Sequence, residues 1–146
     1  LVGSEMCIRD SYSGVDKYMH DVVEKAKKDG YAETMFARRR YLPELTASNA
    51  NTRAFGERVA RNMPIQGTAA DIIKIAMIRV YERLERENLA AKLIMQVHDE
   101  LIVEAPENEK ERVSALLKEE MENAVKLSVA LTADVHSGRT WYDAKG

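Results

Sequence analysis

Three consecutive polar residues, His98, Asp99 and Glu100, interrupt an apolar run in the segment LIMQVHDELIVEA at residues 93–105. Branched and apolar residues on both sides predict two strands, so the polar residues fall at the tip of a hairpin or at its shoulder. Two carboxylates on stiff strands supply oxygen ligands of the kind that Mg²⁺ takes. Alternation along a strand points Asp99 and Glu100 to opposite faces unless a tight turn intervenes. Taken alone, the segment favours a solvated polar turn over a metal site.

A second set of polar residues, Arg58, Asn62 and Gln66, recurs at intervals of four. This spacing predicts a row of hydrogen-bonding side chains along a helix. Arginine reaches phosphate, and the Asn and Gln amides both donate and accept, as contacts to sugars and to the minor groove require. A solvent-facing polar stripe fits the spacing equally well, so the row is a candidate DNA contact and no more.

The charge of residues 38–66 differs from that of the whole chain. This stretch holds six arginines and two acidic residues, whereas the chain has a formal net charge of −2. The planar guanidinium of arginine suits phosphate and base edges better than the ammonium of lysine does. The stretch is therefore a candidate nucleic-acid face, although such runs are more often solvated helix faces.

Length and composition indicate one compact domain, since the chain has 146 residues, of which 45% are hydrophobic and 32% charged. The sequence contains neither an apolar run of about eighteen residues nor a secretory signal, so we expect a cytoplasmic protein without a membrane partner. The single cysteine, Cys7, cannot pair within the chain and fits a reducing compartment.

Apolar spacing predicts four helices and two hairpins, an irregular mixture that indicates an α+β fold. The helices are expected at residues 15–29, from 49 or 52 to 63, at 68–87 and at 109–126. The hairpins are expected at residues 31–42 and 93–105, and a last strand at 132–138. Pro64 should stop or kink the second helix. Thr68, with Asp71 three residues later, predicts an N-cap for the third helix.

Four segments resemble the family A DNA polymerases of bacteria in order and spacing. They are YAETMFARRRYLPEL, ERVARNMPIQGTAADIIKIAM, LIMQVHDELIVE and SGRTWYDA. The resemblance covers residues 12–145 and implies the C-terminal part of a right-hand polymerase domain, with a palm-type antiparallel sheet and packed helices. It also implies that Asp99 binds the catalytic metals, that Glu100 lies near the site with a lesser catalytic and metal-binding role, and that His98 approaches the primer terminus.

The same resemblance places Arg58, Asn62 and Gln66 at positions that contact the template-primer duplex. The implied activity is DNA-directed DNA polymerisation in replication and repair. A primer 3′-hydroxyl attacks the α-phosphate of a deoxynucleoside triphosphate, two Mg²⁺ ions about 4 Å apart hold the attacking and leaving oxygens, and pyrophosphate leaves. The implied partners are primer-template DNA, deoxynucleoside triphosphates and the rest of the polymerase chain.

The sequence departs from the family pattern in two ways. The second metal-binding aspartate of the family lies in an Asp-Tyr-Ser strand, and its fingers helix carries an arginine, a lysine and a tyrosine that grip the nucleotide; the chain contains neither segment. Asp71 and Asp134 match neither motif. We therefore expect an incomplete fragment that is inactive alone, because its two ions require an aspartate that this chain lacks.

The first eleven residues, LVGSEMCIRDS, fit none of these patterns. We expect residues 1–11 to be a non-native leader and residues 12–146 to be the C-terminal palm and fingers part. Two other functions stay open: a non-catalytic duplex-DNA binding module, and a metal-dependent phosphohydrolase. The phosphohydrolase would draw on His20, His98 and His136, whose spacing is not that of a ligand set.

Overall fold

The computed structural model describes residues 13–144, so the expected leader at residues 1–11 lies outside the described part. The chain divides into two compact units, Leu1–Thr68 and Ala69–Gly146, here called the N-terminal and the C-terminal unit. Both units combine helices with a two-stranded antiparallel sheet, which confirms the α+β class. No helix in residues 13–144 is long and apolar enough to cross a membrane.

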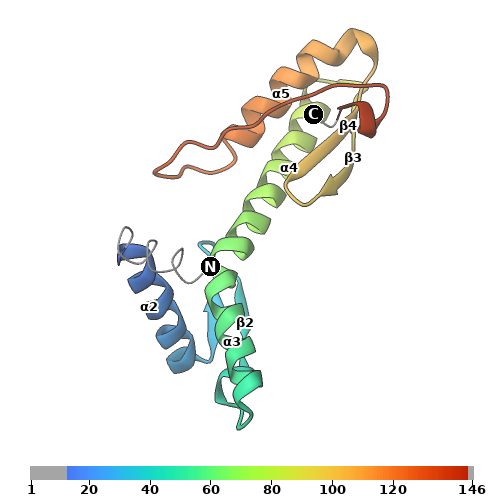
Figure 1. Ribbon diagram of the computed structural model, residues 1–146. Coiled ribbons are helices and arrows are strands. Elements are labelled where there is room, and N and C mark those ends of the chain that lie inside the picture. The colour runs from blue at the N-terminus through green and yellow to red at the C-terminus, as the bar shows by residue number, and fades with distance from the viewer. Residues whose placement is uncertain (1–12, 145–146) are drawn as a thin grey trace. The chain divides into compact units, whose positions relative to one another are not determined.

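The N-terminal unit consists of two helices around a short hairpin (Figure 1). Its elements are α2 (Ser13–Asp29), β1 (Tyr31–Glu33), β2 (Arg39–Tyr41), the 3-10 turn η1 (Pro43–Thr46), α3 (Ala50–Asn62) and the π turn η2 (Met63–Gly67). The strands pair with Tyr31 opposite Tyr41, which confirms the predicted hairpin. Asn49 caps α3, since its side chain accepts hydrogen bonds from the backbone N–H groups of Asn51 and Thr52.

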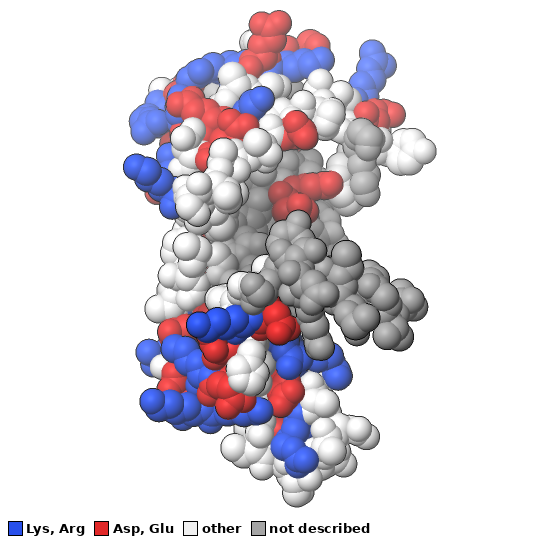
Figure 2. Space-filling model, turned by 60° about the vertical axis from the view of Figure 1, so that its left-hand side comes forward, with Lys and Arg blue, Asp and Glu red and all other residues white. Residues whose placement is uncertain are grey.

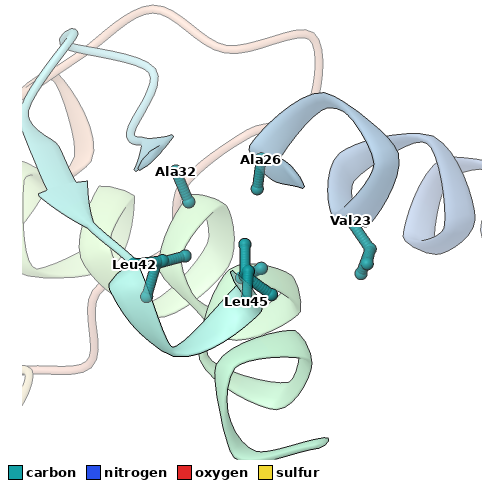
Figure 3. Close-up of a cluster of buried hydrophobic side chains, with 6 residues drawn as sticks. Val23, Ala26, Ala32, Leu42 and Leu45 are labelled. Atoms are coloured by element: carbon teal, nitrogen blue, oxygen red, sulfur yellow. The ribbon is translucent and has the colours of Figure 1, made fainter. Parts of the chain in front are cut away.

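Small and branched side chains form the core of this unit (Figure 3). They come from α2, from the hairpin and its exit, and from α3: Val23, Ala26, Ala32, Leu42, Leu45 and Ala60. Ala60 is fully buried and Leu42 is 1% exposed. Ala26 on α2 and Ala60 on α3 have small side chains, so both helices can approach the hairpin closely. The hairpin therefore packs against α2 and α3 together.

The C-terminal unit packs two helices on the second hairpin. Its elements are α4 (Thr68–Arg86), β3 (Lys92–Val97), β4 (Glu100–Glu104), the 3-10 turn η3 (Glu107–Glu109), α5 (Lys110–Glu122) and the short α6 (Trp141–Ala144). The core is formed by Val80, Leu84, Ala91, Val113, Leu116 and Leu117. The apolar stripes predicted for α4 and α5 supply it, with Val80 and Leu116 fully buried.

Charged side chains also join α4 to α5. Glu120 is 6% exposed and receives hydrogen bonds from Arg79 at 2.8 Å and from Arg83 at 2.6 Å. Burial raises the pKa of Glu120, but the hydrogen bonds from Arg83 and Arg79 outweigh burial and hold the pKa below its ordinary value. Both Arg83 and Arg112 also bond to Glu87. The helices are thus held together by a core and by an ion-pair network beside it.

The prediction that Pro64 stops or kinks the second helix is confirmed: α3 ends at Asn62, and a π turn at Met63–Gly67 takes in the proline before α4 begins. A wider turn tolerates the proline ring and the missing N–H better than an α-helical turn does. Two other expectations about the elements were wrong. Thr68 is not an N-cap, because its backbone is helical (φ −65°, ψ −42°). Residues 132–138 form no strand, and the sheets of the described residues contain only β1 with β2 and β3 with β4.

Candidate functional site

The tip of the β3–β4 hairpin is a turn of two residues, His98 and Asp99. Val97 pairs with Glu100 across the turn, so Glu100 is the first residue of β4. His98 has φ +53°, in the left-handed region where glycine is the usual residue of a tight hairpin. A histidine in this conformation costs free energy that a glycine would not. Ala37 and Asn88 have the same left-handed backbone, so the conformation of His98 does not by itself distinguish a functional tip from a surface turn.

Gln96 supports the turn from within β3. Its side-chain Nε2 donates a hydrogen bond to the backbone carbonyl oxygen of His98 at 2.6 Å. Sequence reasoning missed Gln96, although the signal was present: it is the only polar residue of LIMQV, two positions before the turn.

Both acids predicted at the tip are exposed to solvent. Asp99 lies in the turn and Glu100 at the start of β4. The indole Nε1 of Trp141, in α6, donates a hydrogen bond to Oε2 of Glu100 at 3.4 Å. Trp141 is a second residue that sequence reasoning missed. Residues 13–144 contain no group of three His, Cys, Asp or Glu side chains placed to hold a metal ion, so the tip supplies an acid pair and not a complete ligand set.

The predicted polar row lies in the N-terminal unit. Arg58 and Asn62 are exposed on α3, and Gln66 is exposed in the π turn that follows. The extra residue of a π turn changes where Gln66 falls around the helix axis, so the row is not a straight i, i+4 stripe at its last member. The guanidinium of Arg58 lies 5.9 Å from the ring centroid of Phe55, which adds a flat aromatic surface beside the row.

The β1–β2 hairpin holds the π turn in place. The backbone N–H of Met35 donates to Oγ1 of Thr68 at 3.0 Å, and Nη2 of Arg38 donates to the carbonyl oxygen of Gly67 at 2.9 Å. A Cβ atom on Gly67 would lie 2.7 Å from Cγ2 of Thr34, so only glycine permits this approach. The π turn that contains Gln66 is therefore held in position by side-chain and backbone contacts with the β1–β2 hairpin.

Several arginines of residues 38–66 have partners within the unit. Arg39 pairs with Glu33 and Arg61 with Glu57, each at 3.5 Å, and Arg53 donates to two backbone carbonyl groups. On the face seen in Figure 2, Lys and Arg side chains of this unit alternate with Asp and Glu. The candidate nucleic-acid face is thus narrower than the charge count suggested, and Arg58 is one of its exposed members.

The predicted site residues form two sets, each within one unit. His98, Asp99 and Glu100 are brought together at one hairpin tip, and the row of Arg58, Asn62 and Gln66 follows one helix and its π turn. The first set presents two carboxylates, which are oxygen ligands of the kind that hard cations take. The second can donate to phosphate and exchange hydrogen bonds with sugars and bases.

Comparison with known proteins gives consistent results. The family described as DNA polymerase family A matches residues 8–143. The DNA polymerase I of Bacillus caldotenax is 56% identical over 93% of this chain, and that of Bacillus subtilis is 54% identical over 93%. The chain spans 16% of the length of each of these relatives.

Among solved structures, the chain is similar to the POL domain of Pol1 from M. smegmatis in complex with DNA primer-template and dNTP. The TM-score is 0.91 at 47% sequence identity, and the match covers 94% of this chain and 24% of that one. A family match over nearly the whole chain and a shared fold at this identity lead to one conclusion: the chain belongs to the family A DNA polymerases.

Proposed function

We propose that this chain is the part of a DNA-directed DNA polymerase that supplies an acid pair to the metal site and one face to the primer-template duplex. The observation that carries the proposal is the β3–β4 tip, where a strained two-residue turn exposes His98, Asp99 and Glu100 in a member of family A. The similar Pol1 structure contains primer-template DNA and a dNTP. We propose the same substrates here, and a cytoplasmic location where both are found.

The acid pair fits a role as part of a Mg²⁺ site. Asp99 and Glu100 are adjacent, exposed and formally charged, and Mg²⁺ is commonly bound by one or two carboxylates together with water and substrate phosphates. When bound, two such ions neutralise the developing charge on the attacking and leaving oxygens. The remaining ligands would come from another segment, in line with the missing Asp-Tyr-Ser motif. We therefore expect the 146-residue chain alone to bind duplex without extending a primer.

In the proposed reaction the primer 3′-oxygen bonds to the α-phosphorus of the nucleotide. The bond from the α-phosphorus to the oxygen that joins it to the β-phosphorus breaks, and pyrophosphate leaves with the bonding electrons. The hydroxyl proton passes to solvent. The contribution of this chain is geometric and electrostatic: the stiff hairpin holds the negative charge of the acid pair at one place, and His98 lies beside it to meet the primer terminus.

The row of Arg58, Asn62 and Gln66 is proposed to hold the duplex. Arginine would contact phosphate, which gives affinity without sequence preference, while the two amides reach sugar or minor-groove acceptors. A polymerase must read through every sequence, and the minor groove presents acceptors that are shared among base pairs. The row thus suits a protein that binds all primer-template duplexes alike.

The test is a chimera in which residues 12–146 replace the matching segment of Bacillus caldotenax DNA polymerase I. The proposal predicts that the folded chimera extends a primer in the presence of dNTPs and Mg²⁺. The parent enzyme is the control for assay and folding. A chimera that folds and binds primer-template but adds no nucleotide would refute the polymerase assignment and leave the duplex-binding module as the function.

A further inference from the structure

Helix α6 carries a contact that ties the last described segment of the chain to the acid pair. Trp141 Nε1 donates to Glu100 Oε2 at 3.4 Å, across 41 positions of sequence. Figure 1 shows this short red helix beside the β3–β4 hairpin, at the end of a loop segment that runs back along α5. Since both residues belong to the C-terminal unit, the contact lies within one compact body.

The turn that presents Trp141 is closed by its own hydrogen bonds. The backbone N–H of Thr140 donates to Asp143 Oδ2 at 3.1 Å, and the N–H of Asp143 donates back to Thr140 Oγ1 at 3.2 Å. This reciprocal pair is a capping box built with aspartate. A Cβ atom on Gly138 would lie 2.6 Å from the backbone nitrogen of Ala144, so the chain can fold this tightly only with glycine there.

The extended segment before α6 is also anchored. Val135 packs against the core of the C-terminal unit, and the backbone N–H of buried Ala133 donates to Glu122 Oε1 at 3.1 Å. These two points fix the path of the chain from α5 towards the hairpin. The position of the indole therefore follows from packing, not from a freely moving end.

The chemistry of the donor explains why a tryptophan suits this position. An indole N–H is a donor only and carries no charge. It can fix the direction of a carboxylate and leave its negative charge available to a cation, whereas lysine or arginine would form an ion pair and compete with the metal. We propose that Trp141 is a positioning residue that orients Glu100 beside Asp99; this inference rests on the function proposed above.

The contact can be tested in the chain itself, apart from any activity. The protein has a single tryptophan, so labelling it with ¹⁵N gives one indole N–H signal in an NMR spectrum. Glu100→Gln should shift that signal, because the acceptor loses its charge. Glu104→Gln, at the other end of the same strand, is the matched control and should leave it in place. An indole signal that Glu100→Gln leaves unmoved would overturn the proposal.

The positioning role is tested in the chimera described above. Trp141→Phe keeps an aromatic ring and removes the donor, and we expect the Mg²⁺ concentration for half-maximal extension to rise about 10-fold, as for partners that orient a metal ligand. Tyr142→Phe, in the same helix and 88% exposed, is the control and should change nothing. In the Glu100→Gln background, Trp141→Phe should have no further effect.

The outcomes separate the two proposals. If the chimera never extends a primer, the proposed function fails, while the NMR comparison still decides whether the contact exists. If the chimera extends and the effects of Trp141→Phe and Glu100→Gln on Mg²⁺ dependence simply add, Trp141 does not act through Glu100 and the inference is wrong. Equal melting temperatures of the variants would show that a change in Mg²⁺ dependence is not a loss of folding.

Discussion

The backbone N–H of Met35 donates to Oγ1 of Thr68 at 3.0 Å, so the tip of the first hairpin is fixed to the end of the π turn that presents Gln66. Thr68 is 8% exposed but Met35 is 69% exposed, so the loss of this hydrogen bond costs about 0.5–1.5 kcal/mol and not the larger penalty of a fully buried donor. Thr68→Val removes the acceptor at nearly constant shape. We expect it to lower the free energy of local opening at Met35 by that amount, measured by hydrogen exchange of the Met35 amide.

Thr68→Ser is the control for this prediction. Serine keeps the oxygen and loses one methyl group, which is worth about 0.8 kcal/mol. Exchange at Met35 should therefore change less in Thr68→Ser than in Thr68→Val. Equal protection of the Met35 amide in wild type and Thr68→Val would show that the hydrogen bond does not hold the hairpin.

Ala37 is expected to destabilise the first hairpin. It has φ +60° at the turn between β1 and β2, where a Cβ atom costs about 1–2 kcal/mol. We expect Ala37→Gly to raise the free energy of unfolding of the N-terminal unit by roughly 1 kcal/mol, after part of the gain is offset by the greater chain entropy of glycine. Ala54→Gly, in the exposed middle of α3, should lower it by about 0.5–1 kcal/mol. A destabilising Ala37→Gly would contradict the assigned turn.

The contribution of Glu87 to the stability of the C-terminal unit should be lost at acid pH. Hydrogen bonds from Arg112 and Arg83 lower the pKa of Glu87 from its ordinary value of 4.5 to about 2. A carboxyl group with a lowered pKa stabilises the fold fully above about pH 4.5 and loses that contribution as the pH falls towards 2. Urea denaturation should show a lower free energy of unfolding for Glu87→Gln than for wild type at pH 7. The difference between the two free energies should be smaller at pH 2.5.

The control for this pH dependence is Glu85→Gln, an exposed acid two residues earlier, in the last turn of α4. The difference in free energy of unfolding between Glu85→Gln and wild type should vary less with pH than the corresponding difference for Glu87→Gln. A gap for Glu87→Gln that stays constant from pH 7 to pH 2.5 would show that the ion pairs do not lower the pKa of this carboxyl group.

Arg58 should contribute to duplex binding through phosphate. We expect Arg58→Ala to weaken binding of a primer-template duplex regardless of its sequence, and to reduce the slope of log K against log salt by about 0.9. Binding of a fluorescent duplex at several salt concentrations measures both quantities. Arg86→Ala, an exposed arginine at the end of α4, removes the same charge from the other unit and is the control. An unchanged slope in Arg58→Ala would remove Arg58 from the DNA face.

Local signals were enough to predict most elements. Asn49 is a good helix cap, and the β1–β2 and β3–β4 strands are short and bounded by turns. The apolar stripes of α4 and α5 are regular. Each of these patterns depends on residues that are close together in the sequence. The polar tip at His98 and the row at Arg58 were also visible, because residue type and spacing are local properties. Their roles in binding remain predictions.

The features that were missed depend on tertiary contacts. Thr68 resembles an N-cap in sequence, but its hydroxyl accepts from Met35 on a distant hairpin, and the helix continues through the π turn that Pro64 occupies. Residues 132–138 have strand-like composition but run along α5 instead of joining a sheet. The Trp141 contact to Glu100 spans 41 positions, which no local pattern reports.

The most direct test of the account is primer extension by the chimera carrying Asp99→Ala, with Asp134→Ala as the control for loss of an exposed acid from the same unit. If Asp99 holds the catalytic metal ions, Asp99→Ala should abolish extension and leave the melting temperature and duplex affinity nearly unchanged. Asp134→Ala should leave all three properties unchanged. Extension at the wild-type rate by Asp99→Ala would contradict the assignment of the hairpin tip as part of the metal site.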